Sequence, residues 1–416
     1  MKQAAYPSYK PTGVDWLEDV PSHWDMKRLR FAVQTNPLAS ELRCPPDTLV
    51  SFVPMDAVGE YGGLALDQEK ALDEIGSGYT YFRDNDVVVA KITPCFENGK
   101  GALATGLKNG IAFGTTELHV LRSRDDMDPG FLFYLTISDA FRDLGEAHMY
   151  GAGGQKRVPD AFIKNLRSPI PPIDEQRAIT RFLNEEVGRI DGLIAKKKEL
   201  SRLLDEQKDA VVERAVTLGV KADRDIRPAD LVWIDRVPSD WEVKRIKHLA
   251  KLKSGEAITS LEMFEEGKFP VFGGNGVRGR FDRYTHDGEF VLIGRQGALC
   301  GNINYATGKF WASEHAVVAN PNLDFNTKWF GELLRIMNLN QYSVAAAQPG
   351  LAVENVARLF IPVPPRDEQD EIAEHIESET DAINRVSEGI SAAIKRLIEY
   401  RAAIITAAVT GKIKVV

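Results

Sequence analysis

The sequence predicts an α+β protein that is internally duplicated, with two globular domains separated by two long antiparallel coiled-coil helices. Three observations predict this arrangement. A tryptophan-containing segment near the N-terminus returns near the middle of the chain, and a proline-rich segment returns in the same order. Each copy of the proline-rich segment is followed by a seven-residue apolar repeat. The chain has 416 residues, which is enough for two or three domains with separate cores.

The two repeated segments bracket interiors that differ. Residues 20–29 (VPSHWDMKRL) return as residues 237–246 (VPSDWEVKRI), 217 positions later, with identical residues at six of ten positions. Residues 169–176 (PIPPIDEQ) return as residues 362–369 (PVPPRDEQ), 193 positions later. Because these offsets differ by 24 (217 − 193), the halves share their ends while the interior of the second half is shorter.

Each proline-rich segment introduces a predicted long helix. Asp174 and Asp367 are suited to cap the helix starts, and further acidic residues follow in the first turns. A heptad repeat held over about five heptads indicates a coiled coil, and a helix of roughly 45 residues is about 65 Å long. Two matching seams in one chain would pair antiparallel and hold the globular domains a fixed distance apart. The repeat consists of Leu183, Ile190, Lys197, Leu204, Val211 and Leu218 in the first half, and Ile376, Ile383, Ile390, Leu397, Ile404 and Gly411 in the second, with companion apolar positions at Ile179, Leu193, Leu200, Ile372, Val386 and Ala393.

The predicted boundaries follow from these segments. We expect a first globular domain over residues 1–170, a first long helix over 171–219, a second globular domain over 220–363 and a second long helix over 364–416. The interiors carry short β-like runs such as DVVVA (86–90) and FVLI (290–293), which are punctuated by Gly, Asn and Asp.

Composition narrows the class of protein. The chain has no apolar run long enough for a membrane span and no signal-peptide core, so we expect a cytoplasmic protein without a membrane partner. Its three cysteines form no CxxC pattern, so neither a disulfide framework nor a zinc site is expected. The net charge is −8, yet residues 366–388 alone hold nine acidic and two basic residues. The overall sign therefore does not exclude a nucleic-acid partner.

A search for catalytic motifs finds none. The sequence GNGVRG (274–279) matches the GxGxxG pattern, but no helical period follows it, so we interpret it as a glycine-rich turn or a loop that approaches DNA. There is no GxxxxGK[ST] phosphate loop, no convincing S-adenosylmethionine loop and no Asn-Pro-Pro-aromatic element. We therefore expect a chain without catalytic residues, metal ligands or a cofactor of its own.

Basic residues in the two interiors are the candidates for DNA contacts. They lie among Gly, Asn, Gln and aromatic residues, in loops suited to phosphate contacts and major-groove reading. For each of them the alternative is a solvated surface charge. The candidate DNA-binding residues are Lys91, Lys100, Lys156, Arg157, Gly274, Asn275, Arg278, Arg280, Arg283 and Arg295.

These features together resemble the specificity subunit of type I restriction–modification systems. The resemblance is carried by the paired VPxxWxxKR and PPxDEQ segments with their heptad helices, and by FPVFGGNG (269–276) and IGRQGA (293–298) in the second interior. The corresponding AKITPC (90–95) fits only a looser version. The resemblance implies that each domain reads one half of a split double-stranded DNA site while the helices set the unread gap. It also implies docking of two methyltransferase subunits and of restriction/translocase subunits, which would supply S-adenosylmethionine, ATP and Mg.

Three other functions remain open at this point. One is the recognition subunit of a bipartite-site type II system, which neighbouring genes would distinguish. A self-sufficient DNA methyltransferase would need the cofactor loop and tetrapeptide that the chain lacks. A purely structural coiled-coil scaffold would leave the Gly- and Arg-bearing interiors without a purpose.

Overall fold

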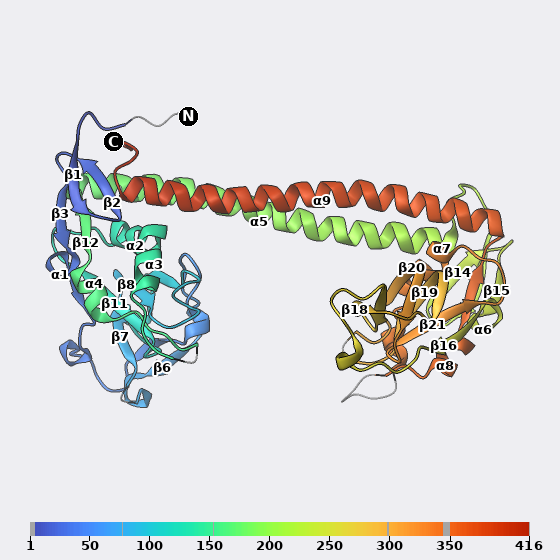
Figure 1. Cartoon of the computed structure of the whole chain (residues 1–416). Coiled ribbons are helices and arrows are strands. Elements are labelled where there is room, and N and C mark those ends of the chain that lie inside the picture. The colour runs from blue at the N-terminus through green and yellow to red at the C-terminus, as the bar shows by residue number, and fades with distance from the viewer. Residues whose placement is uncertain (1–4, 77, 153, 298, 344–349, 416) are drawn as a thin grey trace. The chain divides into compact units, whose positions relative to one another are not determined.

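The computed structural model describes residues 5–415 apart from 77, 153, 298 and 344–349 (Figure 1). The chain divides into two compact units, Met1–Lys197 with Ala392–Val416, and Lys198–Ser391. Two long helices, α5 (Ile173–Leu218) and α9 (Arg366–Val409), contribute residues to both units. The prediction of an α+β fold with two long helices is thus confirmed.

The first unit contains two four-stranded sheets, one in the order β6-β5-β10-β7 and one in the order β4-β11-β8-β9. The hairpin β1–β2 and the pair β3–β12 are separate two-stranded sheets. The strands are β1 (Tyr9–Val14), β2 (Leu17–Pro21), β3 (Asp25–Arg28), β4 (Val33–Thr35), β5 (Leu49–Val53), β6 (Glu69–Ala71), β7 (Thr80–Arg83), β8 (Asp86–Ala90), β9 (Gly101–Leu103), β10 (Ile111–Gly114), β11 (Leu118–Ser123) and β12 (Arg167–Ile170). The short helices are α1 (Leu29–Ala32), α2 (Pro129–Ile137), α3 (Asp139–Ala147) and α4 (Asp160–Asn165).

The second unit has one six-stranded sheet in the order β16-β21-β19-β20-β17-β18. The hairpin β13–β14 and the pair β15–β22 are separate two-stranded sheets. The strands are β13 (Ile226–Leu231), β14 (Ile234–Pro238), β15 (Glu242–Arg245), β16 (Ala250–Ser254), β17 (Phe269–Gly273), β18 (Gly276–Phe281), β19 (His286–Gly294), β20 (Ile303–Ala312), β21 (Ala316–Pro321) and β22 (Phe360–Val363). The short helices are α6 (Ile246–Leu249), α7 (Thr327–Ile336) and α8 (Val353–Arg358).

Strand register shows that the duplication extends into the diverged interiors. Leu118 of β11 pairs with Ala90 of β8, and in the second unit Ala316 of β21 pairs with Gly294 of β19. Two further strand pairs correspond in the same way. β3 pairs with β12 as β15 pairs with β22, and β4 pairs with β11 as β16 pairs with β21. The interiors therefore share a backbone framework although their sequences differ.

Both long helices contribute buried side chains to the core of each unit. In the first unit Trp24 is fully buried with Leu183 of α5 and Val409 of α9. In the second unit Trp241 is buried with Val216 of α5 and Ile376 of α9. Full burial of such large apolar side chains contributes roughly 1.5–3 kcal/mol each, so each globular domain depends on the start of one long helix and the end of the other.

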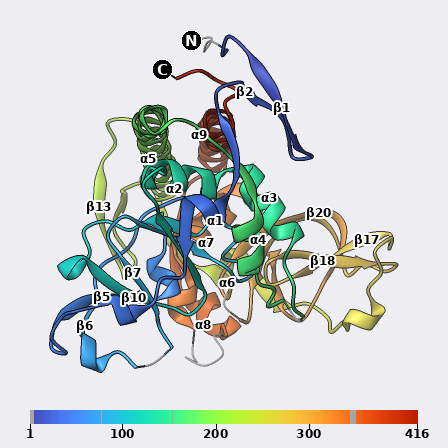
Figure 2. The same ribbon diagram turned by 90° about the vertical axis from the view of Figure 1, so that its left-hand side faces the viewer.

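Within the first unit, α2 and α3 lie under the start of α5 and the end of α9 (Figure 2). The Thr180 hydroxyl of α5 donates to Asp128, the N-cap residue of α2, at 2.7 Å. The Asp139 amide at the start of α3 donates to Thr406 of α9 at 3.3 Å.

The two long helices run antiparallel. In the first unit Arg401 of α9 donates to Asp191 of α5 at 2.6 Å, and in the second Lys208 of α5 donates to Asn384 of α9 at 2.9 Å. The heptad residues Leu183, Ile190, Ile376, Ile383, Ile390 and Ile404 are buried.

Of the companion positions, Ile179 and Ile372 are fully buried as predicted, but three others differ from the sequence prediction. Leu193, Leu200 and Val386 are 44%, 46% and 52% exposed. A pair of helices buries only a narrow stripe along each partner. The apolar stripe in the sequence is wider than the stripe that one partner helix covers.

Candidate nucleic-acid interface

Each unit has a basic residue directly after β8 or β19, and backbone hydrogen bonds hold both its amide and its carbonyl. We call this hydrogen-bonded arrangement a clamp. The Lys91 amide, after β8, donates to the Glu117 carbonyl at 2.9 Å, and the Val158 amide donates to the Lys91 carbonyl at 2.8 Å. In the second unit the Arg295 amide, after β19, donates to the His315 carbonyl at 2.9 Å, and the Leu351 amide donates to the Arg295 carbonyl at 2.9 Å. These two loops therefore have the same hydrogen-bonded framework.

A hydroxyl-stabilised turn supports each clamp. The Thr115 hydroxyl oxygen accepts from the Glu117 amide at 3.2 Å, and the Ser313 hydroxyl oxygen accepts from the His315 amide at 3.4 Å. Such side-chain-to-backbone bonds favour tight turns. The Thr115 and Ser313 amides in turn donate to β5 and β17, at the Val53 and Phe272 carbonyls respectively, so each turn is anchored to its sheet.

In the first unit the structure brings Lys91 and Arg157 together around Glu117. The Arg157 guanidinium donates to both carboxylate oxygens of Glu117, at 2.8 and 3.0 Å. These hydrogen bonds lower the pKa of Glu117, and the positive charge of Lys91 acts in the same direction. Lys156 is exposed beside Arg157. Lys100 is used differently, because its ammonium group donates to the Met55 carbonyl at 2.9 Å.

In the second unit Gly274, Asn275 and Arg295 lie on adjoining loops. Gly274 and Asn275 form the turn between β17 and β18, and the Asn302 amide donates to Asn275. A Cβ atom on Gly294 would overlap the Gly274 carbonyl and lie 2.6 Å from that of Leu299. Glycine is therefore required where the end of β19 passes this turn.

The other three arginines of the prediction lie along β18 or beyond it. Arg278 is exposed, and its aliphatic part lies against Gly273. Arg280 donates to the carbonyls of Gly267 and Lys268 at 2.5 and 2.9 Å, while Arg283 lies over the Phe281 ring, 5.3 Å from its centroid. Phe281 pairs with Phe269 at the end of the hairpin remote from its turn. The structure thus does not bring Arg280 and Arg283 to the turn.

Sequence reasoning missed Glu117, His315 and Asn302. Glu117 and His315 stand at equivalent turn positions, and Asn302 bonds Asn275. The available signal for Glu117 and His315 was a hydroxyl residue two positions earlier, Thr115 or Ser313, directly ahead of a β-run. An isolated acid or histidine in a loop gives no signal unless the equivalent turns of the two halves are aligned with each other.

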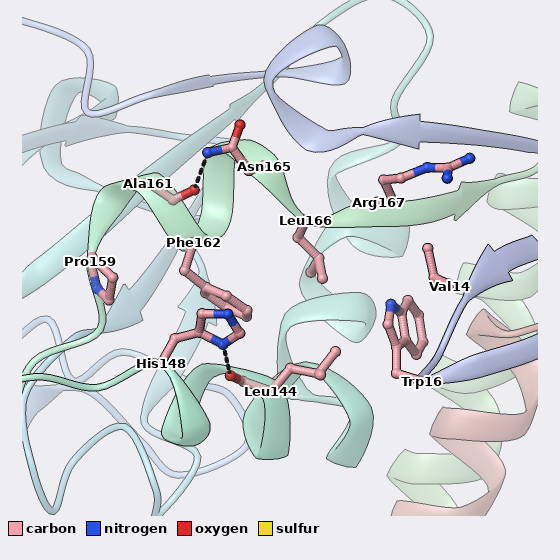
Figure 3. A pocket seen from close by; sticks show the side chains of 10 residues that line it. All are labelled: Val14, Trp16, Leu144, His148, Pro159, Ala161, Phe162, Asn165, Leu166 and Arg167. Carbon is pink, nitrogen blue, oxygen red and sulfur yellow. Dashed lines mark hydrogen bonds between the residues drawn. The ribbon is translucent and has the colours of Figure 1, made fainter.

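A separate pocket lies at the edge of the first unit (Figure 3). It has a volume of about 460 Å³, and its ionisable lining residues are His148 and Arg167. The His148 Nδ1 donates to the Leu144 carbonyl at 2.8 Å, and the Arg167 guanidinium points away from that ring. The remaining lining is mostly apolar, including Trp16 and Phe162. Among its described lining residues, no carboxylate lies beside His148.

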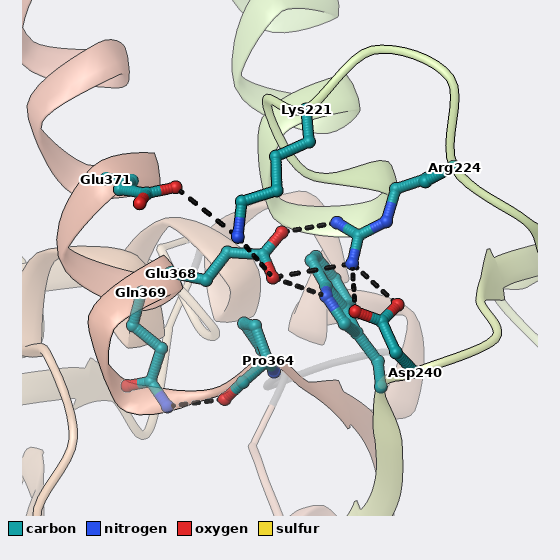
Figure 4. Close-up of polar contacts among 8 residues, drawn as sticks. Lys221, Arg224, Asp240, Pro364, Glu368, Gln369 and Glu371 are labelled. Carbon is teal, nitrogen blue, oxygen red and sulfur yellow. Dashed lines mark hydrogen bonds and ion pairs between the residues drawn. The ribbon is translucent and has the colours of Figure 1, made fainter.

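At the start of α9, the buried carboxylate of Glu368 binds residues of the globular part of the second unit (Figure 4). Glu368, whose side chain is 1% exposed, accepts hydrogen bonds from Arg224 and from the Trp241 indole, the latter at 3.2 Å. Arg224 also pairs with Asp240 at 2.6 Å, and Lys221 lies 3.7 Å from Glu368. A buried carboxylate needs such compensation, because desolvation of an unpaired charge costs several kcal/mol.

The glutamine of each PPxDEQ segment makes matching contacts. Gln176 donates to the Pro171 carbonyl at 2.8 Å and accepts from the Asp128 amide at 2.8 Å. Gln369 donates to the Pro364 carbonyl at 3.0 Å and accepts from the Asn326 amide at 2.9 Å. Each glutamine therefore ties the start of a long helix to the N-terminus of the helix beneath it, α2 or α7.

Two searches of the described residues were negative. Within the part of the chain that the structure describes, no group of three or more His, Cys, Asp or Glu residues could hold a metal ion. Over the same described residues, no helix combines the length and apolarity needed to cross a membrane.

Comparison with known proteins gives a match to a family model within the second half and a similar fold for the whole chain. Residues 238–396 match the type I restriction modification DNA specificity domain. The specificity subunit of the type I restriction enzyme EcoAI from Escherichia coli is 40% identical over 167 residues, which are 39% of this chain and 28% of that protein. This chain thus spans less than a third of the length of that relative.

Solved structures extend the similarity in fold. A chain from the complex of a type I R-M system covers 95% of this chain and 99% of its own length, with a TM-score of 0.77 and 19% identity. The HsdS subunit from Thermoanaerobacter tengcongensis covers 95% and 98%, with a TM-score of 0.56 and 20% identity. Residues 238–396 are thus similar to the type I restriction modification DNA specificity domain, and the chain as a whole has the fold of these two solved structures.

Proposed function

We propose that the chain is the DNA-reading specificity subunit of a type I restriction–modification complex. Each globular domain reads one half of a bipartite double-stranded site. The observation that carries this proposal is the repeated clamp, which presents Lys91 and Arg295 at equivalent places after β8 and β19. A basic side chain held at a fixed place in this way can donate hydrogen bonds to base edges.

The ten candidate DNA-binding residues divide into two roles. Those on the clamp loops or on the adjoining β17–β18 turn are proposed to face the bases, namely Lys91, Arg157, Gly274, Asn275 and Arg295. The other candidates are proposed to contact phosphates or to support the loops, namely Lys100, Lys156, Arg278, Arg280 and Arg283. Phosphate contacts raise affinity and salt dependence without giving sequence preference.

The chain is proposed to act without catalysis of its own. Its partners are two methyltransferase subunits and, in the full complex, restriction/translocase subunits. S-adenosylmethionine, ATP and Mg would be held by these partners. The long helices α5 and α9 are proposed to set the length of the unread gap.

Selection from a randomised pool of duplex DNA tests this function. The chain, co-purified with its methyltransferase partner, is expected to enrich a site with two short specific parts and an unspecified gap. Enrichment of a single continuous site, or of no sequence, would contradict the proposal. Labelled S-adenosylmethionine added to the chain alone should give no methylated DNA.

A further inference from the structure

The ion pair between Arg157 and Glu117 leaves one edge of the guanidinium group available. Arg157 uses Nε and one Nη2 hydrogen for the two bonds to Glu117, at 3.0 and 2.8 Å. Guanidinium has five N–H donors in a planar fork. The Nη1–Nη2 edge thus keeps two parallel donors. Nη1 makes one long hydrogen bond, to the Gln155 carbonyl at 3.4 Å.

The pair is held by backbone contacts on both sides. Arg157 forms β-bridges with Ile92 and Tyr150, while the Glu117 carbonyl accepts from Lys91. The side chains remain accessible, because Arg157 is 38% and Glu117 24% exposed. The guanidinium plane is therefore oriented before any ligand arrives, which reduces the entropy lost on binding.

We propose that Arg157 reads a guanine in the major groove through its Nη1–Nη2 edge, and that Glu117 is its positioning residue. This proposal rests on the proposed function of the chain. Guanine presents two acceptors on that groove edge, O6 and N7, which match two parallel donors. Adenine and cytosine each present an amino donor that would face the guanidinium, and thymine presents a single acceptor beside its methyl group, so guanine is the base that this fork selects.

The second unit has different side chains at the equivalent places. His315 occupies the turn position of Glu117, and the bridge Ile92–Arg157 corresponds to Gln296–Gly350. His315 lies 3.0 Å from Glu314. Since the backbone framework is shared while this pair is not, the guanine reader belongs to the half-site of the first domain alone.

The first test compares Arg157→Lys with the parent chain in the same selection from a randomised duplex pool. Lysine keeps the charge but cannot donate two parallel bonds. The preference for guanine is expected to fall about tenfold at one position of one half-site, while every other position is retained. Glu117→Gln, which removes the carboxylate that orients the fork, should weaken the preference at the same position, and Glu117→Asp should restore part of it.

A second test changes a base of the DNA. 7-Deazaguanine at the identified position removes the N7 acceptor. It should weaken binding of the parent chain about tenfold, and binding of Arg157→Lys by less than about twofold. Lys156→Ala, a matched control on the neighbouring residue, should respond to 7-deazaguanine as the parent chain does.

The outcomes separate the two proposals. If the parent complex selects no bipartite site, the proposed function fails and this inference fails with it. If the parent complex selects a bipartite site but Arg157→Lys leaves all positions unchanged, the guanine reader alone is wrong. Equal sensitivity of the parent chain and Arg157→Lys to 7-deazaguanine at every guanine would also overturn it.

Discussion

Trp241 donates its indole N–H to the buried carboxylate of Glu368, 3.2 Å away. The counterpart of Glu368 in the first unit is Glu175, which is bound instead by Tyr6 at 2.5 Å and His23 at 2.8 Å. The two halves thus share a glutamate at the start of each long helix but satisfy it with different groups. In each unit this carboxylate links the edge of the globular domain to a long helix.

Removal of the Glu368 carboxylate should destabilise the second unit. Glu368→Ala leaves the Arg224 guanidinium, whose side chain is 11% exposed, without its buried partner. Breaking such a pair costs about 3 kcal/mol. Urea unfolding of the full chain measures the loss, and Glu371→Ala serves as the control because that side chain is 50% exposed and should cost less than about 1 kcal/mol. Equal effects of both variants would mean that the buried network does not stabilise the helix start.

The glutamines of the PPxDEQ segments should matter more than an average polar residue. Gln369 is 3% exposed, and Gln369→Ala would leave the Asn326 amide and the Pro364 carbonyl without their partner. Unsatisfied buried groups cost about 1–3 kcal/mol each, so we expect a loss of about 3 kcal/mol in the free energy of unfolding. Gln207→Ala, at an exposed position of α5, should change it by less than about 0.5 kcal/mol. Comparable losses would contradict the role of Gln369.

Stability of the first unit should fall below neutral pH because of His119. Its Nε2 donates to the Val158 carbonyl at 2.9 Å, and burial lowers its pKa. The unfolded chain therefore binds a proton more readily, so stability is fully present above a pH of about 6.5 and is lost progressively as the pH falls below that value.

His119→Gln isolates this effect. Glutamine can donate to the Val158 carbonyl without titrating, so the variant should lose part of the pH dependence between about pH 5 and pH 6.5. Urea unfolding across pH 5–8 provides the measurement. Parallel stability profiles for the two proteins would show that His119 does not cause the decline.

The role of the long helices predicts the effect of a heptad insertion. Seven residues inserted after Leu204 keep the apolar seam in register and add about 10 Å to α5. The unread gap should then lengthen by about three base pairs at ~3.4 Å each, with the bases on either side unchanged. Some stability is expected to be lost, so a matching insertion in α9 is a useful second variant. Methylation-site sequencing reads the gap directly, and an active variant with the parental gap would exclude the helices as its determinant.

The sequence predicted the features that depend on local patterns. The heptads predicted α5 and α9, because an apolar period acts over a few neighbouring positions. The expected caps were wrong, since α5 and α9 begin one residue before Asp174 and Asp367, which lie in the first turns. The exposure of Leu200 and Val386 was not predictable in this way, since burial depends on how many partners surround a helix. The fork of Arg157 and Glu117 was also missed, because it joins residues that are 40 positions apart.

Paired changes at the two clamps test the central claim most directly. Lys91→Ala and Arg295→Ala are introduced separately, and the methylated sites are mapped in cells that carry each variant with the methyltransferase partner. We expect each variant to relax the sequence preference in a different half of one bipartite site, because the two side chains stand at equivalent places in two separate domains. Relaxation of the same half by both variants, or an unchanged site in both, would contradict the account.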